Sequence, residues 1–126
     1  MFATVVVGTD GSETARKAVD AAVELAALSD AALELVCAYE PARRDDVDAT
    51  LADAARRARD AGVPVQEHPR EGDAAEAILD VAEELGADLI VVGHKGMTGA
   101  KRFLLGSVPN RVSHHAPCAV MIIRTT

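Results

Sequence analysis

Aromatic residues are almost absent from this sequence. They make up 2% of the chain and none of them is tryptophan, whereas apolar residues as a whole make up 49%. A hydrophobic core of useful size is therefore available, but it must be built from Val, Leu, Ile and Ala.

Cysteine pairs, long apolar runs and a leader sequence are missing as well. Cys37 and Cys118 do not form a metal-binding or redox spacing, so we expect both to be reduced packing residues. No apolar run approaches the ~20 residues that span a bilayer, and the opening MFATVVVGTDG has no basic region or cleavage site. We expect a soluble, cytoplasmic protein with no membrane partner.

Acidic residues are missing from the last third of the chain. All 20 lie before residue 89, although the net charge is −7, and the segment from there on carries Lys95, Lys101, Arg102, Arg111 and Arg124. This basic segment alternates with Leu, Val and Ile, so it is folded rather than a solvated arm. The acidic body repels a DNA backbone, so no nucleic-acid partner is expected, but a small anion held at one spot fits this charge distribution.

Five short apolar runs alternate with segments of helical period. The strands are expected at 4–7, 33–39, 63–66, 89–92 and 119–123, and the helices at 12–29, 46–61, 74–85 and 108–115. Strands that are apolar on nearly every residue are buried on both faces, as in parallel sheets covered by helices. Pro64 lacks an N–H and suits an edge strand. The pattern predicts one α/β domain over 1–126, with three layers and a five-stranded parallel sheet, and we take the strand order as 3-2-1-4-5.

Capping residues mark several of the expected helix ends. Asp73 with Glu76 forms a capping-box pattern, and Gly62 and Gly86 are placed to end helices in the left-handed conformation. Asp10 is a candidate helix cap with Glu13, and Ser107 is a candidate cap for the last helix.

Ligands in such sheets bind beyond the carboxyl ends of the strands, where the strand order reverses. In the order 3-2-1-4-5 that point lies between the first and fourth strands. It brings together the loop 8–12 and the loop that starts at Gly93. We therefore expect the binding site between these two loops.

The second loop has the spacing of an anion-binding site, Gly93-x2-Gly96-x9-Gly106-Ser107. Glycines permit positive φ and let main-chain N–H groups converge on an anion, and the following helix presents its N-terminus there. The Ser107 hydroxyl either caps that helix or donates to a phosphate oxygen. Four nearby side chains add positive charge or a ring donor: His94, Lys95, Lys101 and Arg102. The loop matches neither the P-loop nor the dinucleotide fingerprint, so it is a phosphate site of a different kind.

These residues resemble the universal stress protein family, specifically its nucleotide-binding branch. The G-x2-G-x9-G-[ST] spacing, the opening VVVGTDGSETARKAV, the ADLIVVG strand and the closing VPNRVSHHAPCAVMIIR all look like that family's, and the likeness covers essentially the whole chain. The resemblance implies a Rossmann-like α/β fold that binds ATP, and a homodimer that pairs through the last strand, 119–123. The ATP-contacting residues implied by it are Gly8, Thr9, Asp10, Cys37, Ala38, Gly93, His94, Lys95, Gly96, Gly106, Ser107 and Val108.

Three functions stay open at this point. The leading one is an ATP-binding regulatory protein of the stress response. The second is a slow ATPase or autophosphorylating protein, and the third is an α/β adaptor that binds no nucleotide. No carboxylate follows residue 88, so Asp10 alone is available as a base, and we expect no fast turnover. We expect no metal site from the protein alone, and Asp10 is the carboxylate that we nominate to contact any Mg²⁺ or Mn²⁺ that arrives with the nucleotide. The segment after Tyr39 is short for the family, which affects the rim over the adenine and the dimer contact.

Overall fold

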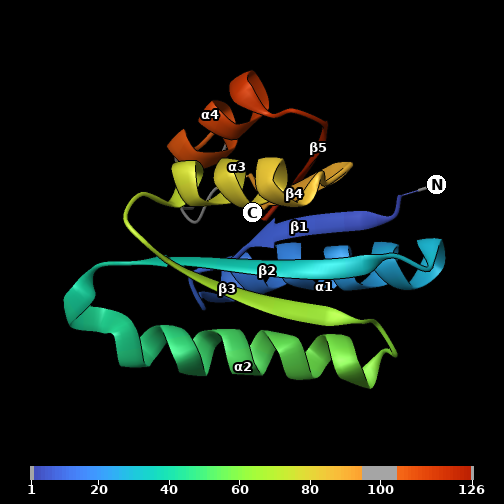
Figure 1. Ribbon diagram of the computed structural model, residues 1–126, viewed down its shortest axis with the longest axis horizontal. Helices are drawn as coiled ribbons and strands as arrows, with labels where there is room; N and C mark the ends of the chain where they lie inside the picture. Colours follow the sequence, from blue (N-terminus) through green and yellow to red (C-terminus); the bar gives the residue numbers. More distant parts are fainter. Residues whose placement is uncertain (1, 95–104, 126) are drawn as a thin grey trace.

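A computed structural model describes residues 2–94 and 105–125. It contains a five-stranded parallel sheet in the order β3-β2-β1-β4-β5, which confirms the predicted fold class and strand order (Figure 1). The strands are β1 (Thr4–Gly8), β2 (Ala32–Tyr39), β3 (Val65–Glu71), β4 (Leu89–Gly93) and β5 (Ala119–Ile123). The helices are α1 (Glu13–Ser29), α2 (Arg44–Asp60), α3 (Ala74–Leu85) and α4 (Ser107–His115), with a single 3₁₀ turn, η1 (Pro41–Arg43), between β2 and α2.

Helices cover both faces of the sheet. One core lies between the sheet and the pair α1 and α2, and the other lies between the sheet and the pair α3 and α4 (Figure 1). The central strands β1 and β4 are buried on both faces, because Val5, Val6 and Val7 have no exposed surface and Leu89 to Val92 have almost none. These continuous apolar runs are what a covered parallel sheet requires.

The third strand lies later in the sequence than predicted. We expected 63–66, but β3 is Val65–Glu71. Its polar residues hid it from a search for apolar runs, since an edge strand need not be buried on both faces. Pro69 lies inside this edge strand. The Pro64 carbonyl and the Gly72 amide bond to β2, so the main-chain groups of the even-numbered residues of β3 face β2. Pro69 is odd-numbered, so its nitrogen, which carries no hydrogen, faces the open edge of the sheet.

The helix ends confirm some of the predicted caps and correct others. Asp73 caps α3 by accepting a bond from the Glu76 amide, and Gly86 ends that helix with φ 62°. The cap of α1 is Ser12, not Asp10: Ser12 accepts from the Ala15 amide, whereas Asp10 accepts from the Ser12 amide. Likewise Gly106 occupies the cap position of α4, and Ser107 is the first helical residue.

Candidate functional site

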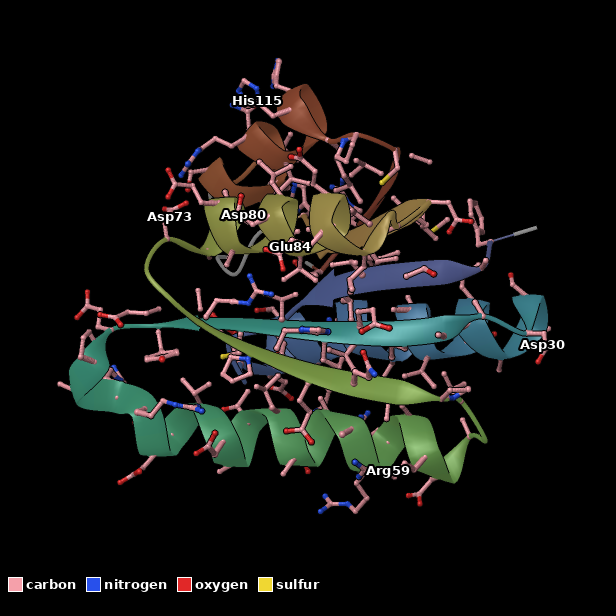
Figure 2. All side chains as sticks on the ribbon, in the orientation of Figure 1. Asp30, Arg59, Asp73, Asp80, Glu84 and His115 are labelled. Atoms are coloured by element: carbon pink, nitrogen blue, oxygen red, sulfur yellow. The ribbon has the colours of Figure 1, made fainter. Side chains whose placement is uncertain are left out.

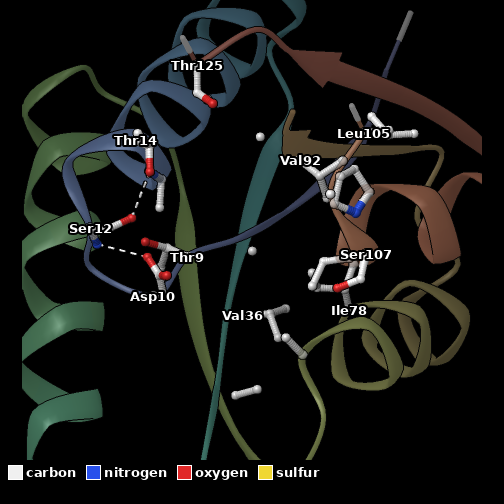
Figure 3. Close-up of a pocket in the computed structure, with 18 residues that line it drawn as sticks. Thr9, Asp10, Ser12, Thr14, Val36, Ile78, Val92, Leu105, Ser107 and Thr125 are labelled. Carbon is white, nitrogen blue, oxygen red and sulfur yellow. Dashed lines mark hydrogen bonds between the residues drawn. The ribbon is translucent and has the colours of Figure 1, made fainter. Parts of the chain in front are cut away.

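A cavity of about 550 Å³ opens at the carboxyl ends of β1 and β4, the point at which the strand order reverses (Figure 3). It is lined by Gly8, Thr9, Asp10, Ser12, Thr14, Ala15, Val36, Ala38, Ala74, Ile78, Val92, Gly93, Leu105, Gly106, Ser107, Val108, Pro109 and Thr125. The loop after β1 forms one wall, and the N-terminal parts of α3 and α4 form the wall across from it. Its volume falls within the range of about 300–1,000 Å³ for small-molecule sites.

At the β2 side of the cavity, the main chain of Ala38 faces an open position. The Thr9 amide bonds to Val36 O at 2.9 Å, and the Ala32 amide bonds to Ala3 O, so the even-numbered residues of β2 face β1. Ala38 continues this series, but β1 has already ended at Gly8. The Ala38 N–H and C=O therefore point into the cavity, one donor beside one acceptor, and the carbonyl oxygen also accepts a weak bond from the Cys37 thiol at 3.8 Å.

The neighbouring Cys37 lies outside this cavity. Its thiol belongs to the core under α1 and α2, and its main chain faces β3, because odd-numbered residues of β2 pair with that strand. Burial, and to a lesser extent Asp10, raises the pKa of the Cys37 thiol. Of the two expected contacts at the end of β2, the geometry places only Ala38 in the cavity.

At the opposite side, the first turn of α4 presents main-chain amides. The first bond of this helix runs from the Asn110 amide to Gly106 O, and Pro109 has no N–H. The Ser107 and Val108 amides precede that bond, so they are left for a ligand or water, at the positive end of the helix dipole. The Gly106 amide is used inside the chain, since it bonds to His94 O at 3.1 Å.

The two described glycines of the loop motif do not have positive φ. Gly106 has a φ of −65°, and positive φ occurs instead at Gly11, Gly62, Gly72 and Gly86. Gly93 borders the crevice in another way. The His94 amide bonds to Ile123 O on β5, so the main chain of Gly93 faces β1, where pairing has already stopped at Val7 and Val91.

The loop after β1 is held by its own side chains. Thr9 Oγ1 accepts from the Gly11 amide at 3.1 Å. Asp10 Oδ1 accepts from the Ser12 amide at 2.9 Å (Figure 3). The hydroxyls of Ser12 and Thr14 lie 3.1 Å apart. Asp10 carries the only charged side chain among the described lining residues.

The structure brings together most of the residues expected at the site. Those that line the cavity are Gly8, Thr9, Asp10, Ala38, Gly93, Gly106, Ser107 and Val108. His94 is buried, with 7% of its surface exposed, and does not line it. Lys95, Gly96, Lys101 and Arg102 lie outside the described residues.

Several lining residues carry no signal in the sequence. Thr14, Ile78 and Thr125 are three of them, and they come from α1, α3 and the segment after β5. Their presence depends on how the helices and the last strand pack, which no local motif records. Ser12 is different, because it belongs to the loop 8–12, which the sequence placed at the site.

The described part of the chain offers neither a metal-binding cluster nor a membrane-spanning helix. Within residues 2–94 and 105–125, no three His, Cys, Asp or Glu side chains are grouped to hold a metal ion. Over the same residues, no helix has the length and apolar character needed to cross a bilayer.

Comparison with known proteins agrees with this architecture. The model of the universal stress protein family matches residues 1–55 and 42–124. The chain is 38% identical to the universal stress protein Rv1636 of Mycobacterium tuberculosis over 144 aligned positions, which cover 99% of this chain and 98% of that protein.

Two solved structures of similar proteins hold adenine nucleotides. A universal stress protein in complex with cAMP is 40% identical to this chain and superposes with a TM-score of 0.88. The superposition covers 99% of this chain and 98% of that one. The universal stress protein from Archaeoglobus fulgidus in complex with dAMP is 26% identical, with a TM-score of 0.80 and coverage of 96% of this chain and 97% of that one. The family match, the sheet order and the relatives of nearly equal length together establish that this chain belongs to the universal stress protein family.

Proposed function

We propose that this protein is an ATP-binding regulatory protein of the stress response, which holds the nucleotide in the cavity between β1 and β4. One observation carries the proposal. The cavity has a paired donor and acceptor on the Ala38 main chain at one end and helix-terminal amides at the other, Ser107 and Val108. Adenine offers a matching acceptor and donor along one edge, and phosphate oxygens would accept hydrogen bonds from the Ser107 and Val108 amides.

The spacing of the two ends suits a nucleotide. β2 and β4 lie on either side of β1 in the sheet, and neighbouring strands are about 4.8 Å apart. The base would lie beyond β1 against Val36, Ala38 and Ile78, with the ribose near Asp10. The phosphates would lie between Gly93 and Ser107.

A cyclic or linear monophosphate is the second candidate ligand. The 40%-identical structure is a complex with cAMP. Asp10 also disfavours additional phosphate charge nearby unless Mg²⁺ or Mn²⁺ accompanies the nucleotide. ATP, AMP and cAMP therefore belong in one titration.

The deciding experiment is a calorimetric titration of each nucleotide, with and without Mg²⁺, against wild type, Ser107→Pro and Ser107→Ala. Proline removes the amide hydrogen at the first position of α4 and is tolerated there, and Gly106 already has the extended conformation that a residue before proline needs (φ −65°, ψ 165°). We expect Ser107→Pro to weaken nucleotide affinity at least tenfold, whereas Ser107→Ala keeps the amide and changes affinity little.

Wild-type protein that binds none of these nucleotides at millimolar concentration would support the adaptor function instead. Equal loss in both Ser107 variants would assign the contact to the hydroxyl rather than to the amide. Phosphate release from ATP, compared between wild type and Asp10→Ala, separates a binding protein from a slow ATPase. We further propose that the protein works in the cytoplasm as a homodimer that pairs through β5.

A further inference from the structure

The segment that follows β5 ends in the cavity. Arg124 and Thr125 leave the edge of the sheet, and Thr125 is buried, with 3% of its surface exposed. Thr125 lines the same cavity as Ser107 and Thr14, and Figure 3 shows its side chain at the end of the cavity formed by Thr14 and Val92. No motif or family resemblance assigned a role to this residue.

Gly93 and Thr125 fit each other closely. A Cβ built on Gly93 would lie 3.2 Å from Thr125 Cγ2, which is closer than ordinary van der Waals contact. The space that glycine leaves at position 93 is thus filled by the Thr125 methyl group. From the sequence, we expected the missing side chain of Gly93 to let a phosphate approach the main chain. In the structure, the Thr125 side chain occupies part of that space.

Lys17 on α1 holds this segment in place. Its Nζ donates to the Thr125 carbonyl oxygen at 3.1 Å, across 108 residues of sequence. The contact uses the main chain of Thr125, so it persists when the side chain is exchanged. It also places a positive charge behind this wall of the cavity.

Thr125 lies at the phosphate side of the proposed nucleotide. It contacts Gly93 at the end of β4, on the side of the sheet that carries β5, whereas Ala38 lies on the other side of β1. We propose that Thr125, held by Lys17, forms the wall that faces the phosphate group of a bound adenosine phosphate. The inference rests on the proposed nucleotide function and adds a residue and a supporting lysine to it.

The test compares Thr125→Asp with Thr125→Asn, which is nearly equal in size and uncharged. AMP and adenosine are titrated into both variants and wild type by calorimetry. A carboxylate in this wall repels a phosphate a few ångströms away, so we expect Thr125→Asp to weaken AMP binding about tenfold or more and to leave adenosine binding within about twofold. The loss should shrink at high salt, and Thr125→Asn should bind AMP nearly as wild type does.

The alternative results are distinct. Equal weakening of AMP and adenosine would reduce Thr125 to a structural role, and unchanged AMP affinity in Thr125→Asp would move the phosphate elsewhere. Either result overturns this inference while the nucleotide function stands. Wild-type protein that binds neither compound would overturn the proposed function, and this inference with it.

The lysine contact is tested by amide hydrogen exchange without nucleotide. Lys17→Met should speed exchange at Arg124 and Thr125. Arg16→Met should not, because Arg16, next to it on α1, faces Asp53 of α2 at 3.8 Å. Unchanged exchange in Lys17→Met would remove Lys17 from the proposal.

Discussion

Gly11 is the residue on which the loop after β1 depends most directly. Its φ of +83° is rare for residues with a side chain, and a Cβ there would lie 2.8 Å from Thr50 Oγ1 on α2. Glycine therefore meets two separate requirements at this position, one of conformation and one of space. Both keep Thr9 and Asp10 at the cavity.

We expect Gly11→Ala to lower the free energy of unfolding by more than about 1–2 kcal/mol, the usual cost of a left-handed conformation, because a steric contact adds to it. Gly62→Ala is the matched control: its φ is +75° and nothing lies within 4 Å, so it should show the conformational cost alone. Thr50→Ala should restore part of the loss in Gly11→Ala and none in Gly62→Ala. Urea denaturation of the single and double variants measures these differences, and equal losses at both glycines would exclude the contact.

Residue types and spacing predicted the loops of the site but not which groups face the cavity. Asp10 and Ser107 were expected near a ligand from their position alone. Cys37 could not be separated from Ala38, since the distinction depends on which neighbouring strand each residue faces. Thr125 lines the cavity because of the register of β5 against β4 and because Lys17 bonds to its carbonyl oxygen. Neither feature produces a recognisable pattern in the sequence.

At the scale of elements, an ion pair joins the two helices beside the cavity. Arg111 of α4 lies 3.0 Å from both carboxylate oxygens of Asp73. Asp73 caps α3, and Figure 2 shows it at the start of that helix. A second pair, Arg70 with Glu84, anchors the other end of α3 to β3. The bond from the Glu76 amide, and after it the bond from Arg111, lowers the pKa of Asp73.

We expect Asp73→Asn to keep the cap, because asparagine caps as well as aspartate, and to lose the ion pair. Both partners are 44% exposed, so the coupling measured by a double-mutant cycle with Arg111→Ala should be only about 0.5 kcal/mol at neutral pH. The pKa of Asp73 is lower in the folded protein than in the unfolded chain, where it is about 3.9. The ion pair therefore stabilises the fold at pH values above the unfolded pKa, and this stabilisation is lost as the pH falls through the folded pKa.

Denaturation of the four proteins in that cycle at pH 7 and near pH 2 measures the effect. The coupling should disappear at the lower pH. The control is a second double-mutant cycle, on Arg70 and Glu84, the ion pair at the other end of α3. Coupling that persists in acid would show that packing, not charge, joins the two helices.

Elements with a strong local signal were predicted well. The capping residues and period of α3 gave its bounds as 74–85, the range that the structure has. β3 was misplaced because an edge strand with Gln, Glu, His and Arg lacks the apolar run used to find strands. The start of α4 was off by one residue because either Gly106 or Ser107 suits a cap position.

At the scale of the whole molecule, the parallel sheet with helices on both faces followed from the alternation of elements and from where the apolar runs lay. The strand order did not follow from these patterns alone, because another order of a doubly wound sheet has the same alternation of elements, but the order taken for this chain is the one that the structure has. The position of the cavity followed from that order. The depth of the cavity and the wall formed by the segment after β5 could not be predicted, because they depend on how α3, α4 and Thr125 pack against the sheet.

β5 is an edge of the sheet, the one through which we propose that two copies of the chain pair. Ile123 O accepts from the His94 amide of β4's end, so the alternate residues Val120 and Ile122 present their main-chain groups to the outer edge. Ile122 is 39% exposed and Val120 is partly exposed. An open edge with apolar side chains favours pairing with another strand, and a lysine at such an edge opposes it.

We therefore expect wild-type protein to sediment as a dimer at micromolar concentration and Ile122→Lys to sediment as a monomer. Burying this charged side chain at a strand–strand contact costs more than one edge pairing returns, and the two copies of the lysine repel each other across a two-fold axis. Leu28→Lys is the control, because Leu28 is an exposed apolar residue, 80% accessible, in the last turn of α1, and its replacement should leave the dimer intact. Circular dichroism checks that both variants remain folded. A folded Ile122→Lys protein that still dimerises, or a Leu28→Lys protein that does not, would move the self-contact away from β5.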